Sequence, residues 1–134
     1  MAVPIVDPER YPQQLEAKRE RIHTRFAHLT PPMLEVYPSP PSHYRMRAEF
    51  RVWHEGDDLF YAMFEVDPEA PKNKRVIRLD QYPVASERIN QLMPQLLEAV
   101  RGNPTLRRKL FQAEFLTTLS GEALITLIYH RQLD

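Results

Sequence analysis

Residues 42–61, SHYRMRAEFRVWHEGDDLFY, concentrate side chains that could bind nucleic acid. Arg45, Arg47, Arg51 and Trp53 fall on odd-numbered positions, which places them on one face of any strand formed here. Guanidinium groups give bidentate hydrogen bonds to phosphate and stack on bases, and aromatic rings stack on unpaired bases. A sheet face with both groups is a candidate platform for a single strand or a loop of RNA.

A second stretch, NPTLRRKLFQ, places three basic residues just before Phe111. Other interpretations of both stretches stay open at this point. The arginines can pair with Glu49 and with acids on the next strand, while Trp53 and Phe111 can belong to an ordinary core. A protein partner could also bind the same face. The residues alone therefore leave RNA binding, a protein-interaction surface and a purely structural role in competition.

The sequence contains no pattern typical of catalysis or of a metal centre. It has no cysteine, which excludes disulfides, zinc–thiolate sites and a cysteine nucleophile within these residues. Its three glycines are isolated, so neither a dinucleotide-binding turn nor a P-loop can form. The five histidines lack the spacing of metal ligands, and the adjacent Asp57 and Asp58 are interpreted as a solvated turn. We predict no catalytic residue, no metal and no cofactor in this chain.

Length and charge favour one soluble domain. At 134 residues the chain has the size of a single domain and can bury a core. Its 18 basic and 18 acidic side chains cancel, so any affinity for nucleic acid must come from a local arrangement of charge. No apolar run approaches the roughly 20 residues that span a bilayer, and the first ten residues lack the features of a signal peptide. We therefore expect a cytoplasmic protein that does not enter the membrane.

Three segments carry the signals of helices. Apolar residues recur at helical spacing over residues 8–28, after an aspartate and proline that suit a helix start. A second apolar stripe covers residues 89–100, and Pro94 inside it should kink the helix or break it locally. Asn103 and Pro104 repeat the capping pattern, which predicts a short helix through residue 108.

Five segments have the alternation or β-branched content of strands, and they are residues 43–53, 59–66, 75–79, 110–119 and 122–130. Gly56 supplies the first tight turn, while Ser120 and Gly121 supply the last. The resulting order is α-β-β-β-α-β-β, with hairpins and no obligatory parallel crossover. We predict an α+β fold, an antiparallel sheet of about five strands with helices packed on one face. The other face would be open to a partner.

These stretches resemble a known enzyme family. SPPSHYRMRAEFRVWHEGDDLFYAMF is similar to the N-terminal part of the bacterial tRNA (uracil-5-)-methyltransferases, and the chain from YPVASERINQ to YHRQLD follows that family's order of helix, short helix and hairpin. The resemblance covers almost the whole chain and is most specific over residues 38–64 and 103–134. It implies an S-adenosylmethionine-dependent enzyme that methylates C5 of the T-loop uridine of tRNA after a cysteine attacks C6.

The resemblance also implies three RNA-binding residues. Arg51 in AEFRVW is expected to contact the backbone or bases of the T-loop. Phe111 in RRKLFQ is expected to stack against a displaced base, and His130 in LIYHRQLD to contact the RNA. A flipped uridine leaves a vacancy in the loop, and an inserted aromatic ring compensates part of the lost stacking. Arg45 and Arg47 receive no role from the resemblance.

The resemblance also implies that tRNA recognition and catalysis lie in separate domains. The family's catalytic S-adenosylmethionine-binding domain is absent from these residues, so residues 1–134 are expected to form a single N-terminal tRNA-recognition domain that is inactive alone. The expected partners are the T-arm stem-loop of tRNA and the remainder of the methyltransferase chain. The alternative is a non-catalytic protein-interaction or structural α+β domain that does not bind RNA.

Overall fold

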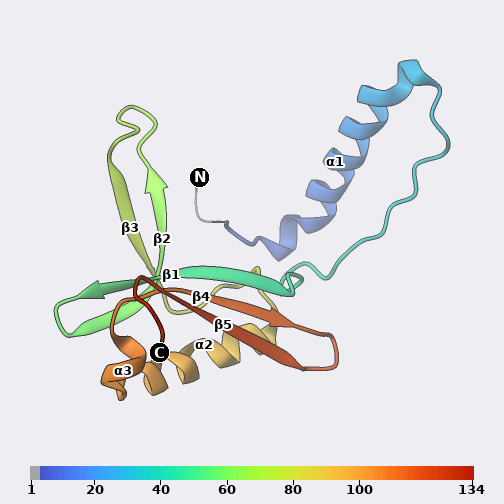
Figure 1. Ribbon diagram of the computed structural model, residues 1–134. Helices are drawn as coiled ribbons and strands as arrows, with labels where there is room; N and C mark the ends of the chain where they lie inside the picture. The colour runs from blue at the N-terminus through green and yellow to red at the C-terminus, as the bar shows by residue number, and fades with distance from the viewer. Residues whose placement is uncertain (1–3) are drawn as a thin grey trace.

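A five-stranded antiparallel sheet forms the centre of the molecule (Figure 1). The computed structural model describes residues 4–134. The strand order across the sheet is β3-β2-β1-β4-β5, and every neighbouring pair is antiparallel. The predicted α+β class is confirmed. The strands are β1 (Arg47–Glu55), β2 (Asp58–Val66), β3 (Lys74–Leu79), β4 (Leu110–Thr117) and β5 (Ala123–Tyr129).

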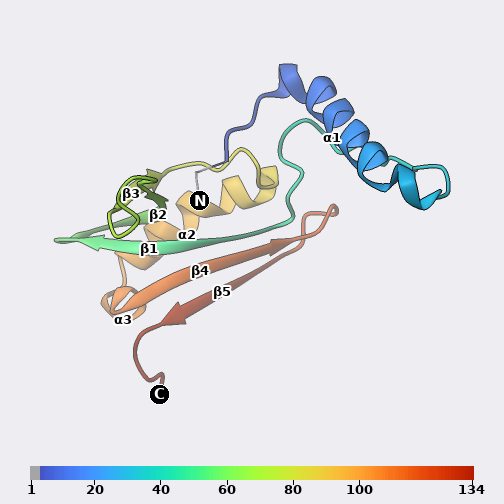
Figure 2. The ribbon, with the colours of Figure 1, turned by 90° about the horizontal axis from the view of Figure 1, so that it is seen from above.

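The helices occupy very different places around this sheet. The long helices are α1 (Tyr11–Phe26) and α2 (Glu87–Arg101), and the short helix α3 is Pro104–Arg107. Two short 3₁₀ segments flank α1, namely η1 (Pro8–Arg10) and η2 (Ala27–Leu29). α2 runs along one face of the sheet, whereas α1 stands away from it (Figures 1 and 2). No helix in the part of the chain that the structure describes is long and apolar enough to cross a membrane.

The core lies between α2 and the even-numbered side chains of β1. Ala48, Phe50 and Val52 are buried there, as the alternation of β1 predicts. The Phe50 ring lies 5.5 Å from that of Tyr61 and 6.0 Å from that of Phe115, in the tilted geometry that aromatic rings favour. Burial of this aromatic cluster against α2 supplies the main driving force for folding.

The α2 helix runs without a break through Pro94, so the local break expected there is not found. Proline removes one backbone hydrogen bond, the one to the carbonyl of Asn90. Pro94 itself is exposed, while Met93 before it and Leu97 one turn later are buried against the sheet. The Tyr61 hydroxyl also donates a hydrogen bond of 2.6 Å to the Met93 carbonyl. Packing on both sides of the proline therefore outweighs one missing hydrogen bond.

The α1 helix forms where the sequence predicts it but has no buried residue. Thr30, in the left-handed conformation, ends η2 and turns the chain back along α1 through the proline-rich residues 31–41. The Tyr11 hydroxyl accepts a hydrogen bond of 2.8 Å from the Ser39 backbone N–H, which ties the two segments together near the sheet. The helix with its returning segment thus projects from the sheet as a separate layer (Figures 1 and 2).

The junction between α2 and β4 gives a test of this architecture. The Ser86 hydroxyl accepts from the Ile89 N–H at 3.2 Å to cap α2, and it also lies 2.7 Å from the buried Thr117 hydroxyl. Ser86→Ala should lower the free energy of unfolding by about 2 kcal/mol, because it removes a helix cap and leaves a buried hydroxyl with weaker partners. Ser120→Ala, in an exposed turn, is the control and should change it by less than about 0.5 kcal/mol. Equal urea midpoints for the two variants would contradict the importance of this junction.

Candidate nucleic-acid interface

The face of the sheet opposite α2 carries an aromatic and basic surface. Residues directly opposite each other in neighbouring strands share a face, and Arg51 lies opposite Ala62 on β2 and Gln112 on β4. Trp53 lies opposite Phe60 in the same way. None of the helices in residues 4–134 lies over this face (Figures 1 and 2). We call it the open face.

Three residues that are far apart in the sequence form one stack on this face. The guanidinium carbon of Arg51 lies 3.9 Å from the centroid of the Phe111 ring. The His130 ring is stacked on Phe111, with 3.7 Å between centroids and 22° between planes. Two groups this close to one centroid cannot share a side of the ring, so Phe111 lies between them. The structure thus brings together Arg51, Phe111 and His130, the residues singled out by the sequence.

An irregularity at the start of β4 places Phe111 in the stack. The pairing of β4 with β5 shifts between Leu110 and Gln112, which leaves Phe111 as an extra residue in its strand. Such a bulge re-aims a side chain relative to regular alternation. Lys109 just before it adopts a positive φ of 56°, so the chain turns sharply out of α3 into β4. Leu110 stays buried in the core while Phe111 joins the open face.

The same turn fixes His130 at the end of β5. The His130 backbone N–H donates to the Lys109 carbonyl at 3.0 Å. The neighbouring Arg131 side chain donates to the carbonyls of Arg108 at 3.1 Å and Thr105 at 2.9 Å. Backbone and side-chain bonds therefore hold residues 130 and 131 against the end of α3. The imidazole of His130 remains exposed on its outer side.

Arg51 has neither an ion pair nor a side-chain hydrogen bond among residues 4–134, whereas Arg47 has ion pairs and Arg45 has a hydrogen bond to a hydroxyl. Its Nε is buried and has no hydrogen-bond partner in the described chain. The guanidinium is held by aromatic rings, Phe111 and also Phe64 at 5.3 Å. The positive charge without a carboxylate partner favours an anionic ligand, which would accept from the Nη groups because the Nε is buried.

Arg47 and Arg45 are engaged within the protein. Arg47 pairs with Glu49 at 3.2 Å and with Glu114 at 3.6 Å, and Arg45 donates to the Tyr82 hydroxyl at 3.3 Å. The alternative of a protein-interaction or structural domain without RNA binding predicts ion pairs for all three arginines and burial of Trp53 and Phe111. Of the three arginines, Arg47 alone has ion pairs within residues 4–134, and the side chains of Trp53 and Phe111 are half-buried. On the open face, the guanidinium of Arg47 is therefore paired with carboxylates, whereas that of Arg51 has no ion-pair partner within residues 4–134.

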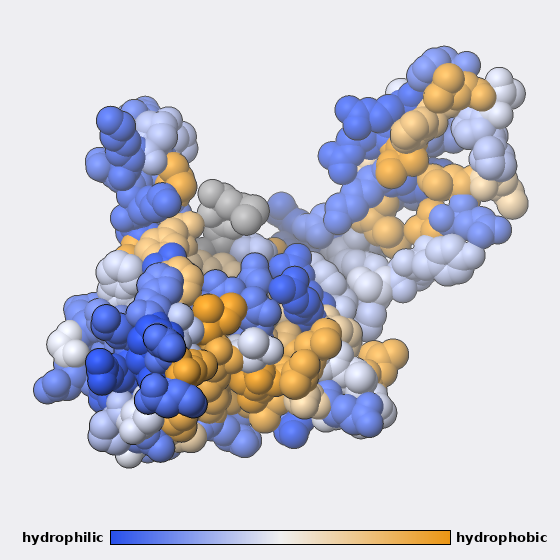
Figure 3. Space-filling view, in the orientation of Figure 1, coloured by the Kyte–Doolittle hydropathy of each residue, from blue (hydrophilic) through white to orange (hydrophobic). Residues whose placement is uncertain are grey.

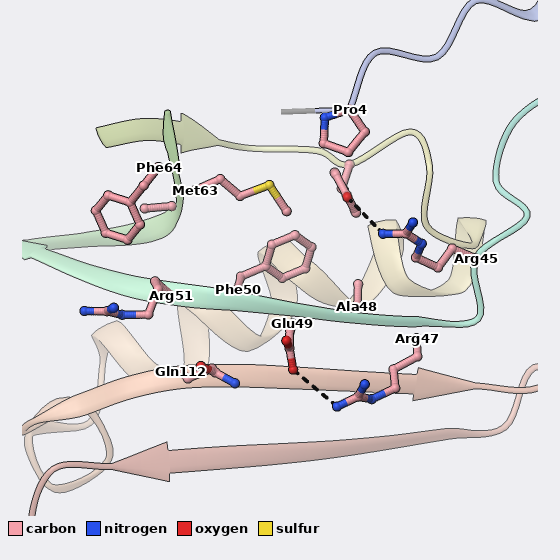
Figure 4. Close-up of a pocket in the computed structure, with 12 residues that line it drawn as sticks. Pro4, Arg45, Arg47, Ala48, Glu49, Phe50, Arg51, Met63, Phe64 and Gln112 are labelled. Carbon is pink, nitrogen blue, oxygen red and sulfur yellow. Dashed lines mark hydrogen bonds and ion pairs between the residues drawn. The ribbon is translucent and has the colours of Figure 1, made fainter. Parts of the chain in front are cut away.

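A hollow of about 830 Å³ lies beside Arg51, where sequence reasoning indicated none (Figure 4). β1 pairs with β2 only from Arg51 to Glu55, because the β2–β3 hairpin bends away from the first half of β1. The hollow lies in this fork. Its lining includes Phe50, Met63, Phe64 and Gln112, together with Arg47 and Arg51 of β1 and Arg45 just before that strand. Alternation within one strand cannot reveal where two strands separate, so nothing in the sequence pointed to Phe64 and Gln112.

The carboxylates near the β1–β2 turn are structural. Asp58 accepts from Arg101 at 3.2 Å and from Arg78 at 3.3 Å, which links the turn to α2 and β3. The Leu59 backbone N–H, followed by Arg101 and Arg78, holds the pKa of the Asp58 carboxyl below its ordinary value, against the opposing effect of desolvation. Residues 4–134 contain no group of three or more side chains suited to hold a metal ion.

Comparison with known proteins identifies one family. A family model described as tRNA (Uracil-5-)-methyltransferase matches residues 10–134. The chain is 75% identical over 134 residues to the tRNA/tmRNA (uracil-C(5))-methyltransferase of Chromohalobacter salexigens. It is 60% identical over 124 residues to the protein of the same name from Acinetobacter baylyi, and 57% identical over 129 residues to that of Shewanella amazonensis.

These alignments cover nearly all of this chain but only part of each relative. They include 100%, 92% and 96% of this chain, but only 36%, 34% and 34% of the respective relatives. The chain therefore spans about a third of the length of the curated relatives it matches.

The buried Nε of Arg51, which has no hydrogen-bond partner, leads to a prediction about the free energy of unfolding. Arg51→Met keeps an aliphatic stem on Phe111 and removes a buried unsatisfied N–H, so the lost cation–π contact and the relieved desolvation should offset each other. Its free energy of unfolding should stay within about 1 kcal/mol of the parent value. Arg101→Met, which loses a charged donor to the Leu59 carbonyl at 2.9 Å, should lose about 1.5 kcal/mol. Urea unfolding of both variants checks this, and a larger loss for Arg51→Met would show that Arg51 serves stability.

Proposed function

The chain belongs to the tRNA (uracil-5-)-methyltransferase family, and we propose that it is the tRNA-recognition domain of such an enzyme. The proposal covers residues 1–134 as one unit whose open face binds the T-arm stem-loop of tRNA. It is supported by the name printed for the family and its relatives, and by the stack of Arg51, Phe111 and His130.

The single observation that carries the proposal is the uncompensated guanidinium of Arg51 within an aromatic stack. RNA offers both partners that this arrangement lacks, namely anionic or carbonyl oxygens and unpaired bases with free faces. Phosphate or base oxygens approaching through the hollow beside Arg51 would accept from its free donors. A neutral overall charge fits such local recognition better than general affinity for polyanions.

The geometry also refines how a base would be received. Both sides of the Phe111 ring are occupied, by Arg51 and by His130. An unpaired base of the T-loop therefore extends the stack on the exposed outer side of His130, and Phe111 supports it from beneath. This arrangement allows the loop to open a base while the lost stacking is replaced by protein.

Methyl transfer belongs, in this proposal, to the remainder of the methyltransferase chain, which is the partner of this domain. S-adenosylmethionine and the cysteine nucleophile would reside there, because this chain has neither cysteine nor a glycine-rich loop. The complete enzyme would methylate C5 of the T-loop uridine, and it would act in the cytoplasm, where bacterial tRNA is found. The present domain alone would bind RNA and leave the base unmethylated.

Binding of a T-arm stem-loop tests the proposal. His130→Ala removes the ring on which the base would stack and should weaken binding roughly 5- to 150-fold, because stacking contributes about 1–3 kcal/mol per base. Phe111→Ala should also weaken binding, because it removes the ring that supports both His130 and Arg51. Arg51→Met should also weaken binding and reduce the slope of log K against log salt by about one contact. Leu119→Ala, at a fully exposed turn away from the stack, is the control and should bind like the parent. Affinities come from fluorescence anisotropy at several salt concentrations, with unfolding midpoints measured in parallel.

Two results would overturn the proposal. If the parent chain binds the T-arm no better than an unrelated hairpin of equal length at moderate salt, the open face is not a T-arm site. Loss of binding in Leu119→Ala equal to that in Phe111→Ala would place the RNA elsewhere on the molecule.

A further inference from the structure

The projecting part of the molecule, residues 11–41, exposes an apolar surface that no described element covers. We call it the arm; it comprises α1, η2 and the returning proline-rich segment. Ile22 and Phe26 on α1 are 46% and 45% exposed, and Met33 on the returning segment is 88% exposed. Apolar residues line the inner side of the arm in the space-filling view (Figure 3). An apolar surface this continuous on a soluble domain marks an interaction site.

The arm encloses an open cleft between its two segments. The cleft has a volume of about 860 Å³ and is lined by Ile22 and Phe26 on one side and by Met33 and Leu34 on the other. Bonds between Tyr11 and Ser39 close the arm near the sheet, so the cleft is shaped before anything occupies it. Its volume exceeds that of several buried side chains, and the two segments do not fill it themselves.

We propose that this cleft seats an apolar segment from the remainder of the methyltransferase chain. The proposal rests on the proposed function, in which this domain acts with a catalytic part. The relatives are about three times as long as the residues matched here, so a large polypeptide is attached to the equivalent domain in each of them. RNA has no apolar segment to fill a cleft of isoleucine, phenylalanine, methionine and leucine, whereas a protein segment does.

Charge around the cleft narrows the chemistry of the occupant. Residues 10–30 contain five Lys and Arg side chains against two Glu. At the cleft itself the charges balance, because Arg19 is paired with Glu16 and Glu35 also lines the cleft. The segment that fits is therefore an apolar strand or helix that brings no charge into the cleft.

The position of the arm indicates where a catalytic part docked on it would lie. The arm and the β2–β3 hairpin rise from the same side of the sheet and flank the space above β1 (Figures 1 and 3). A catalytic part that is anchored on the arm would lie next to the open face. Docking through the arm would thus set the distance between the bound T-loop and the methyl donor.

Hydrogen exchange in a full-length protein tests the docking. The probe is a chimera in which this chain replaces the matching residues of the C. salexigens relative, compared with this chain alone. We expect peptides covering residues 19–37 to exchange at least ten-fold more slowly in the chimera. Phe26→Glu should remove this protection and lower kcat for methyl transfer at least ten-fold, whereas the matched control Leu119→Glu should change neither. Because Phe26 is half-exposed in this chain, the variant should fold, and its T-arm affinity as an isolated domain should match the parent.

Three results would overturn the docking, and each is distinct from failure of the proposed function. Equal exchange of residues 19–37 in the chimera and the isolated chain would show that nothing covers the cleft. Protection of the same peptides by the T-arm RNA alone would assign the cleft to RNA. Dimerisation of the isolated chain that Phe26→Glu abolishes would assign it to a second copy. T-arm binding by the isolated chain is measured separately and does not depend on the arm.

Discussion

The contact between the Arg51 guanidinium and the Phe111 ring is the interaction on which the functional surface depends. A charged group that is partly removed from water usually has a carboxylate beside it, since desolvation is otherwise unfavourable. Arg51 has none among residues 4–134, and the faces of Phe111 and Phe64 compensate only in part. The proposed T-arm site is therefore centred on a cation that lacks a carboxylate partner among the described residues.

Much of the surrounding structure serves to hold this contact. The bulge at Phe111 and the positive φ of Lys109 bring the ring to the open face without disturbing the buried Leu110. Hydrogen bonds from Arg131 to the end of α3 bring His130 to the other side of the ring. Beneath them, the aromatic core and α2 supply the rigidity that keeps the stack in register. Precise placement on strands suits a recognition site better than placement on a mobile loop.

Local patterns in the sequence predicted the elements well, and the reasons are visible in particular residues. Alternation in β1 separated Phe50 and Val52 from Arg51 and Trp53, and the predicted cap Asn103 marks a real helix start. How the elements bring distant residues together in space was harder to predict. The stack joins three distant positions through a bulge that has no signature in its own residues. The fork between β1 and β2, which creates the hollow, depends on how a hairpin bends.

Periodicity also could not say what would cover an apolar stripe. The stripe of α1 predicted a helix correctly, but the residues that face the sheet belong to α2 instead. α2 packs on the sheet because Ile89, Met93 and Leu97 belong to the same core cluster as the aromatic residues, whereas α1 contributes no buried residue. Pro94 shows the same priority of packing over local preference, since the helix passes through it unbroken.

The Arg51 Nε–H group itself offers the most direct measurement of the central claim. Its ¹H–¹⁵N NMR signal can be assigned by comparison with Arg51→Met and followed while a T-arm stem-loop is added. We expect this signal to shift to a saturating limit, as RNA oxygens accept from the Nη groups of the same guanidinium, with parallel shifts of the Phe111 and His130 ring resonances. A signal that stays unchanged when the RNA is saturating would contradict the assignment of Arg51 and its stack to T-arm recognition.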